Sequence, residues 1–145
     1  MKILNRKAFH DYHMLQTYVA GIILTGSEVK SLREGKANIN DAHIVIMDNE
    51  VFIKNMFIDK YKEANINNHE EKADRKLLLN KKEIKKLVKD VQNNGITIIP
   101  LEIFLLKGRF KMKIAVAKGK KLYDKRESKK EKDIERDTQR ELASK

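Results

Sequence analysis

The sequence predicts a mainly β domain with a few helices, followed by a basic C-terminal tail. Several runs are rich in β-branched and aromatic residues and are separated by turn signals, which is typical of strands. Residues 81–93 instead have the apolar spacing of an amphipathic helix. From Lys118 onward apolar residues become scarce. We therefore expect one folded domain at residues 1–117 and a charged tail at residues 118–145.

The first 35 residues predict a helix, a strand and a second helix. A short helix is expected at residues 8–15, and the β-branched run at residues 18–24 predicts a strand. A second short helix then opens at Gly26, with Ser27 as its expected N-cap. Gly35 stands just past its expected end, where the left-handed conformation available to glycine is favoured.

Two strands and a polar loop are expected next. Residues 39–47 and 51–58 predict an antiparallel pair, because Asp48-Asn49 between them is a hairpin turn signal. Residues 59–76 are mostly polar, so we expect a loop there.

The segment after this loop predicts the most regular helix of the chain. Asn80 is the expected N-cap, and Asn94-Gly95 ends the helix. Its apolar residues fall at i, i+3, i+4 and i+7, namely Ile84, Leu87, Val88 and Val91. Five lysines occupy the other face, namely Lys81, Lys82, Lys85, Lys86 and Lys89. Such a face can be a solvated surface as well as a binding surface.

The last two strands form a basic hairpin. Residues 96–106 predict a strand that bends at an edge or bulge because it contains Pro100. After the turn Lys107-Gly108, residues 109–117 alternate strictly, which places Phe110, Met112, Ile114 and Val116 inward. The outward set is Arg109, Lys111, Lys113, Ala115 and Ala117, and it continues into Lys118, Lys120 and Lys121. This basic stripe favours a polyanionic partner.

Five strands with a helix between the third and the fourth are typical of a small closed β-barrel of the oligonucleotide-binding (OB) kind, with flanking helices. An open mixed sheet with helices on one face is the alternative.

The net charge narrows the class of partner. The chain has 32 Lys or Arg and 21 Asp or Glu, a net charge of +11, which indicates a nucleic acid or an acidic membrane. It has no cysteine, which excludes disulfides, thiolate zinc sites and a cysteine nucleophile. No apolar run has the length of a membrane span, and the N-terminus lacks a signal peptide. We therefore expect a soluble cytoplasmic protein that does not bind membranes.

No motif predicts catalysis. Gly35-Lys36 and Gly119-Lys120 lack the remaining residues of a P-loop. His10 and His13 could share a helical face, but no third metal ligand lies nearby. No pair of carboxylates is singled out for acid–base chemistry. We expect a protein that is not an enzyme and that needs no metal or cofactor.

The tail cannot fold alone. It contains 11 Lys or Arg and seven Asp or Glu, a net charge of +4, and it buries too little apolar surface to offset its ordering entropy. It has no Gly or Pro after Gly119, and its residue types favour helix. We expect it to be disordered alone and helical on a binding surface.

Several strings of residues carry a resemblance to a known family. They are Asn5-Arg6-Lys7-Ala8-Phe9-His10-Asp11-Tyr12, Gly26-Ser27-Glu28-Val29-Lys30-Ser31-Leu32-Arg33, Gly35-Lys36-Ala37-Asn38, Arg75-Lys76-Leu77-Leu78-Leu79 and Ala117-Lys118-Gly119-Lys120-Lys121-Leu122-Tyr123-Asp124-Lys125-Arg126-Glu127. Together they closely resemble the small protein B (SmpB) family, the SsrA-binding proteins of bacterial ribosome rescue. The resemblance extends in order over almost the whole chain.

The resemblance implies an OB-like barrel that binds the tRNA-like domain of transfer-messenger RNA (tmRNA, also called SsrA RNA). It also implies delivery of this RNA to stalled 70S ribosomes for trans-translation, in which the nascent chain is tagged. The implied partners are tmRNA and the small-subunit RNA of the ribosome, and the protein is expected to be a monomer. A generic chaperone for single-stranded or ribosomal RNA and a ribosome-bound scaffold are the alternatives.

The resemblance and the basic stripe together select the candidate site residues. The expected RNA-binding residues are Asn5, Arg6, Glu28, Lys30, Arg33, Lys36, Asn38, Arg109, Lys111, Lys113, Lys118, Lys120 and Lys121. In the tail, the residues expected at the ribosomal decoding centre, where the tail becomes helical, are Tyr123, Asp124, Lys125, Arg126, Lys130 and Ile134.

Two of these residues have a second explanation. Glu28 is a carboxylate in a basic motif, so we expect it to accept from base or ribose donors or to pair with Lys30 and Arg33. Its alternative role is favourable placement in the first turn of a helix. Asn38 can contact RNA or simply cap a turn. The family's frequent Asp-Ser-Tyr is Asp41-Ala42-His43 here, which removes a hydroxyl and an aromatic ring.

Overall fold

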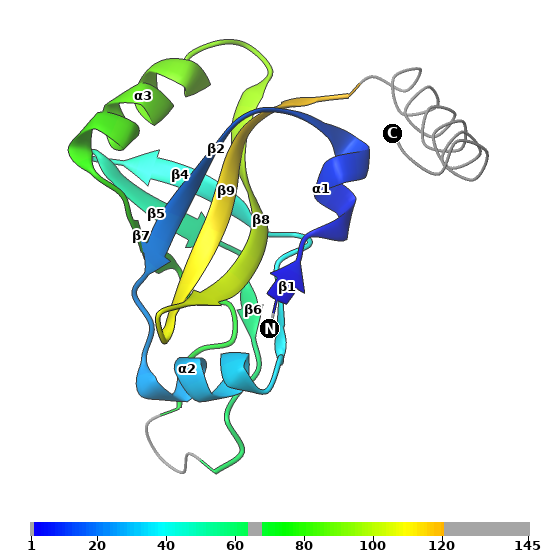
Figure 1. Cartoon of the computed structure of the whole chain (residues 1–145), viewed down its shortest axis with the longest axis vertical. Helices are drawn as coiled ribbons and strands as arrows, with labels where there is room; N and C mark the ends of the chain where they lie inside the picture. Colours follow the sequence, from blue (N-terminus) through cyan, green and yellow to red (C-terminus); the bar gives the residue numbers. More distant parts are fainter. Residues whose placement is uncertain (1, 64–67, 121–145) are drawn as a thin grey trace, which may run out of the picture.

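The computed structural model describes residues 2–63 and 68–120 (Figure 1). Within these ranges the fold is mainly β with three helices, as predicted. The elements are β1 (Lys2–Leu4), α1 (Arg6–Asp11), β2 (Tyr12–Ile22), α2 (Gly26–Arg33), β3 (Ala37–Asn38), β4 (His43–Met47), β5 (Glu50–Lys54), β6 (Phe57–Ile58), β7 (Arg75–Leu78), α3 (Lys81–Val91), β8 (Ile96–Leu106) and β9 (Arg109–Gly119).

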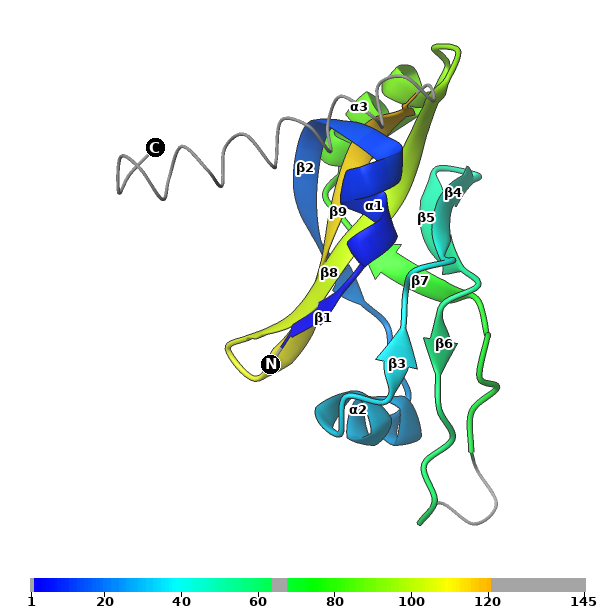
Figure 2. The same ribbon diagram turned by 90° about the vertical axis from the view of Figure 1, so that its right-hand side faces the viewer.

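Seven of the described strands form one antiparallel sheet in the order β1-β8-β4-β5-β7-β2-β9. Strand β9 also pairs with β8, so the pairings from β8 through β4, β5, β7, β2 and β9 return to their start. Strand β1 lies outside this ring on β8, and β3 and β6 form a separate pair. Helices α2 and α3 lie at opposite ends of the sheet, and α1 lies on its flank (Figures 1 and 2).

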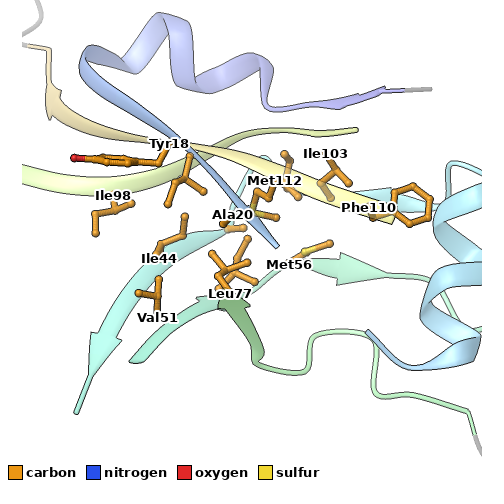
Figure 3. Close-up of a cluster of buried hydrophobic side chains, with 14 of the residues drawn as sticks. Tyr18, Ala20, Ile44, Val51, Met56, Leu77, Ile98, Ile103, Phe110 and Met112 are labelled. Atoms are coloured by element: carbon orange, nitrogen blue, oxygen red, sulfur yellow. The ribbon is translucent and has the colours of Figure 1, made fainter. Parts of the chain in front are cut away.

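The main hydrophobic core fills the space inside the ring. Side chains of Tyr18, Ile44, Leu77, Ile98 and Met112 converge there from five different strands (Figure 3). Each end helix adds one fully buried leucine to the same cluster, Leu32 from α2 and Leu87 from α3. The two helices therefore seal the core at its two ends.

A second, smaller core lies outside the ring under α1. Ala8 of α1 packs on Ile99 and Leu101 of β8 and on Ala115 and Ala117 of β9. The prediction that Ala115 and Ala117 face solvent is therefore wrong, because α1 covers them. The predicted inward set of β9 is confirmed, since Phe110, Met112, Ile114 and Val116 are all buried.

Helix α3 confirms its prediction. Asn80 is the N-cap: its side chain accepts from the Glu83 backbone N–H at 2.9 Å, and the Glu83 carboxylate accepts in return from the Asn80 N–H at 3.2 Å. This reciprocal pair is a capping box. The helix ends at Val91, two residues before the predicted end.

The other two helices differ in detail from the prediction. Helix α1 ends at Asp11 because the chain then pairs with β9, starting with Tyr12 opposite Gly119. Backbone pairing thus replaces the predicted helix at residues 12–15. The N-cap of α2 is Thr25 rather than Ser27. Gly35 has a φ of 72° and follows the end of α2 as predicted.

The predicted strands at residues 39–47 and 51–58 are each interrupted. A turn at Asn40, whose N–H donates to the Asn38 side chain at 2.8 Å, separates β3 from β4. Asn55 has a positive φ of 62° and separates β5 from β6. The predicted loop at residues 59–76 is wrong at its end, because Arg75 and Lys76 begin β7. The predicted order of five strands, with a helix between the third and the fourth, is therefore wrong.

The hairpin turns and the irregularity at the proline agree with the sequence-based predictions. Asp48-Asn49 and Lys107-Gly108 have positive φ angles at both positions, which is typical of tight hairpin turns. The register between β8 and β9 shifts after Pro100, which confirms the predicted bulge. Strand β9 extends to Gly119, two residues beyond its predicted end.

A buried ion pair joins α2 to β7. Arg75 Nε donates to Glu28 Oε2, and both side chains are almost completely buried. The remaining guanidinium nitrogens donate to the carbonyl of Met56 at 2.6 Å and to the carbonyls of Glu70 and Glu71, both at 3.2 Å. One side chain therefore ties together α2, β7, the β5–β6 connection and the segment that precedes β7.

Replacing Arg75 by Met should destabilise the fold strongly, because the Glu28 carboxylate would stay buried without its cation. We expect the free energy of unfolding to fall by about 3–5 kcal/mol. The matched control is Lys54→Met, which breaks the exposed Lys54–Asp74 pair and should cost less than about 1 kcal/mol. Urea unfolding followed by circular dichroism measures both losses. Equal, small losses would mean that the buried pair adds no more than a surface pair.

Candidate nucleic-acid interface

The candidate RNA-binding residues fall into two groups in the described part of the chain. The α2 end comprises Lys30, Arg33, Lys36, Asn38, Arg109 and Lys111. The α1 flank comprises Asn5, Arg6, Lys118 and Lys120, and Lys113 lies between the groups on β9. The continuous basic stripe predicted along β9 is thus divided, because the buried Ala115 and Ala117 separate its two halves. Lys121, Tyr123, Asp124, Lys125, Arg126, Lys130 and Ile134 lie outside the described residues.

The α2 end brings together basic residues from distant parts of the sequence. Lys30 and Arg33 are exposed on α2, and Arg109 is exposed where β9 begins. A cavity of about 220 Å³ separates the two segments, lined by Val29 of α2 and by Arg109 and Lys111. Figure 1 shows the β8–β9 turn beside α2. Arg109 and Lys111 therefore line a hollow beside the helix that carries Lys30 and Arg33.

A tyrosine orients one lysine at this end. Lys30 Nζ lies 5.4 Å from the centroid of the Tyr61 ring, within range of a cation–π contact. The Tyr61 backbone exchanges two hydrogen bonds with the Asn68 side chain, at 3.2 and 2.9 Å. Lys36 is partly neutralised, since its Nζ lies 3.2 Å from Glu34 Oε2. Lys30 and Arg33 thus carry the accessible charge of α2.

Asn38 is exposed on β3 and has the predicted turn-capping role. Its side-chain oxygen accepts from the Asn40 N–H, as described above. Asn38 also lines a cavity of about 200 Å³ with Phe57 and Lys72. The side chain therefore shapes the local turn while remaining accessible.

Glu28 faces the interior and not the basic surface. It is 3% exposed, and its Oε1 accepts from the Thr25 N–H at 2.8 Å. Its other oxygen binds Arg75, so the expected pairing with Lys30 and Arg33 is wrong. The expected favourable place in the first helical turn is confirmed as part of a capping box with Thr25. Glu28 thereby fixes the position of α2.

A histidine adds a second attachment for α2 that the sequence did not indicate. His69 Nδ1 lies 2.8 Å from Ser27 Oγ, and its Nε2 lies 3.0 Å from the Ile58 carbonyl oxygen. The ring is buried, so both of its polar atoms are satisfied inside the protein. The sequence pattern alone indicates no role for His69 and does not mark Arg75 as a site residue. A basic residue at the start of an apolar strand was the available signal for Arg75.

The α1 flank is organised by Asn5. This residue is 3% exposed; its Nδ2 donates to the Pro100 carbonyl at 2.7 Å, and its N–H donates to the Leu101 carbonyl at 2.8 Å. Both acceptors lie at the bulge of β8. Asn5 thus anchors the start of α1 and leaves Arg6 exposed beside it.

The other side of the α1 flank is the end of β9. Lys118 is exposed and lies opposite His13 of β2. Lys120 Nζ donates to the Phe9 carbonyl at 3.2 Å, and its N–H donates to the Asp11 carbonyl at 2.9 Å. The chain therefore leaves the described structure against the C-terminal end of α1.

Two other kinds of site receive no support from the described residues. Residues 2–63 and 68–120 contain no group of three potential metal-ligating side chains. None of their helices is long and apolar enough to cross a membrane.

Known proteins are similar to this chain over nearly its full length. A curated SsrA-binding protein of Acholeplasma laidlawii is 53% identical over 147 residues and covers 100% of this chain and 99% of its own length. An SsrA-binding protein of a Sulfurihydrogenibium species is 50% identical over 141 residues, or 97% and 93% of the two chains. One from Clostridium botulinum is 51% identical over 138 residues, or 95% and 88%.

The fold has a solved relative as well. A structure described as "tmRNA-SmpB: a journey to the center of the bacterial ribosome" contains a chain that superposes with a TM-score of 0.70 and 39% sequence identity. The match covers 83% of this chain and 85% of that one. The family profile described as SmpB protein matches residues 2–144. The chain therefore belongs to the SmpB family.

Proposed function

We propose that this protein binds the tRNA-like domain of tmRNA and delivers it to stalled 70S ribosomes, where the nascent chain is tagged and the ribosome is rescued. The observation that carries the proposal is the identity of about half of all residues with SsrA-binding proteins over nearly the whole chain. The related tmRNA-SmpB structure supports the same partners. The task is binding and positioning, so the protein acts without catalysis of its own, as a monomer in the cytoplasm.

The body, residues 1–117, acts as a closed OB-like barrel. The ring of paired strands and the two end helices support this assignment. RNA recognition of this kind depends on a rigid shape, on phosphate neutralisation and on stacking of unpaired bases. A closed core with sealed ends provides the rigidity, since its side chains are packed from all directions.

The α2 end is the surface that holds the tRNA-like domain. It combines the exposed cations of α2 with Arg109 and Lys111 of β9, which line a cavity bordered by α2 through Val29. Phosphates of a folded RNA are the natural partners of Lys30, Arg33, Arg109 and Lys111. Glu28 and Asn5 contribute as positioning residues, because both are buried and hold α2 and α1 in place. Lys113 contributes charge between the two groups.

The α1 flank and the tail face the ribosome. Lys118 and Lys120 lead directly into Lys121 and the tail residues Tyr123, Asp124, Lys125, Arg126, Lys130 and Ile134. In this proposal the tail beyond Lys120 is disordered when the protein is alone, and the polyanionic ribosomal RNA neutralises it so that it becomes helical. Lys118 and Gly119 belong to β9 and Lys120 is bonded to α1, so the proposed tail begins three residues later than the sequence predicts. Arg6 is exposed on the same flank and adds to its charge.

Filter binding at one fixed salt concentration tests the proposal. The affinity for the tRNA-like domain of tmRNA should exceed the affinities for an ordinary tRNA and for an unstructured RNA of equal length. Equal affinities for all three would instead support the generic RNA chaperone.

Removing two cations from α2 should weaken tmRNA binding by losing phosphate contacts. We expect Lys30→Gln with Arg33→Gln to lower the slope of log affinity against log salt by about 1.5, or roughly 0.7–0.9 per contact. The control, Lys54→Gln with Lys76→Gln, removes the same charge from lysines already paired with Asp74 and Glu50. An unchanged slope for the α2 variant would remove α2 from the interface.

Removing residues 129–145 should separate RNA binding from ribosome rescue. The body and Lys118 to Lys121 remain, so the truncated protein should bind isolated tmRNA nearly as well as the full chain. Tagging of nascent chains on stalled ribosomes should collapse, because the segment proposed for the decoding centre is gone. Full tagging by the truncated protein would show that the tail is dispensable. Loss of tmRNA binding in solution would show that the tail contacts tmRNA and not the ribosome.

A further inference from the structure

Helix α3 carries a lysine face, formed by Lys81, Lys82, Lys85, Lys86 and Lys89. All five side chains are exposed. At 3.6 residues per turn they fall within an arc of about 140°, and the acidic residues Glu83 and Asp90 lie outside it. The helix therefore presents an undivided cationic surface.

These charges are not neutralised by neighbours. Elsewhere, Lys7, Lys36, Lys54 and Lys76 each lie 3.2–3.5 Å from a carboxylate oxygen. Among residues 2–63 and 68–120, none of the five α3 lysines has an ion-pair partner. Glu83, in the first turn of the helix, is engaged with the Asn80 N–H in the capping box. The lysine face thus retains its full charge for an external partner.

The packing of α3 determines which polyanion it suits. A helix that lies on a membrane inserts its apolar face among the lipids. Here Leu87 is fully buried, and Ile84 and Val91 pack on the same core, so no apolar face is left to insert. The lysines are the exposed residues of the helix, and their ammonium groups bind phosphates as point charges without reading sequence. The chemistry fits the backbone of an RNA better than a lipid bilayer.

The position of α3 separates it from the α2 end. The two helices seal opposite ends of the core, so one rigid RNA domain held at α2 does not cover α3 (Figures 1 and 2). Figure 1 shows the last described residues of β9 at the same end as α3. The tail proposed for the ribosome therefore starts on the α3 side of the molecule.

We propose that the α3 lysine face is a second phosphate-binding surface, which contacts ribosomal RNA of the small subunit while the α2 end holds tmRNA. From Lys81 to Lys89 the helix rises about 12 Å. One strand of a duplex presents about three phosphates over that length, at roughly 3.4 Å each. The face therefore matches a short stretch of backbone. The proposal rests on the proposed function only for the identity of the two RNAs.

The test removes charge from the centre of the face without changing the fold. Lys85→Gln with Lys89→Gln keeps good helix formers at exposed positions. The complex of protein and tRNA-like domain is titrated with isolated small ribosomal subunits at several salt concentrations. We expect several-fold weaker binding at physiological salt and a salt slope lower by about 1.5. Binding of the tRNA-like domain alone should not change.

Two matched controls separate local contacts from overall charge. Lys85→Arg with Lys89→Arg keeps the charge and should bind subunits like the unmodified protein. Lys54→Gln with Lys76→Gln removes equal charge at lysines that are already paired, and should change little. An equal loss for this pair, or no loss for the α3 pair, would overturn the proposal.

Two further results would also overturn the proposal. If the α3 variant binds the tRNA-like domain more weakly, the lysine face contacts tmRNA. If the variant loses binding to acidic phospholipid vesicles but still binds subunits, the lysine face contacts membranes. If the unmodified protein fails to bind the tRNA-like domain, the proposed function fails instead. The same variants, titrated without tmRNA, then still decide whether α3 binds ribosomal RNA.

Discussion

The buried pair of Glu28 and Arg75 is the constraint on which the α2 end depends. A carboxylate and a guanidinium removed from water are each costly alone, so the two elements that carry them must meet with matched geometry. Arg75 also donates to three backbone carbonyls, that of Met56 between β5 and β6 and those of Glu70 and Glu71 between β6 and β7. The position of α2 is thereby specified by polar groups that tolerate little displacement. The accessible cations of α2 are held in place as a result.

Sealing the core at two ends has a consequence for the surface. Each end helix turns its apolar residues inward and leaves its basic residues outside, namely Lys30 and Arg33 on α2 and five lysines on α3. A single compact body thus carries two cationic regions that face away from each other. This arrangement suits a protein that connects two RNAs, since neither region competes with the other for the same partner.

The second core under α1 explains why the basic residues are grouped and not continuous. Small residues on the outer face of β9 let α1 approach closely, and Ala8 fills the space beside Ala115 and Ala117. The side chain of Asn5 fastens this helix to the bulge at Pro100. A bend in one strand therefore fixes a helix, and the helix divides the charge on the neighbouring strand.

The sequence by itself determined several of the local elements of this protein. The spacing of Leu87 and its neighbours, the caps at Asn80 and Gly35, and the hairpin turns at Asp48 and Lys107 depend on contacts between near residues, and the structure has all of them. Family membership was also visible, because it depends on residue identity alone. Only the tertiary structure decided the partner of Glu28, the burial of Asn5 and Ala115, and the strand at Arg75. Each of these depends on segments far apart in the chain, and no local pattern states which distant group will cover a given side chain.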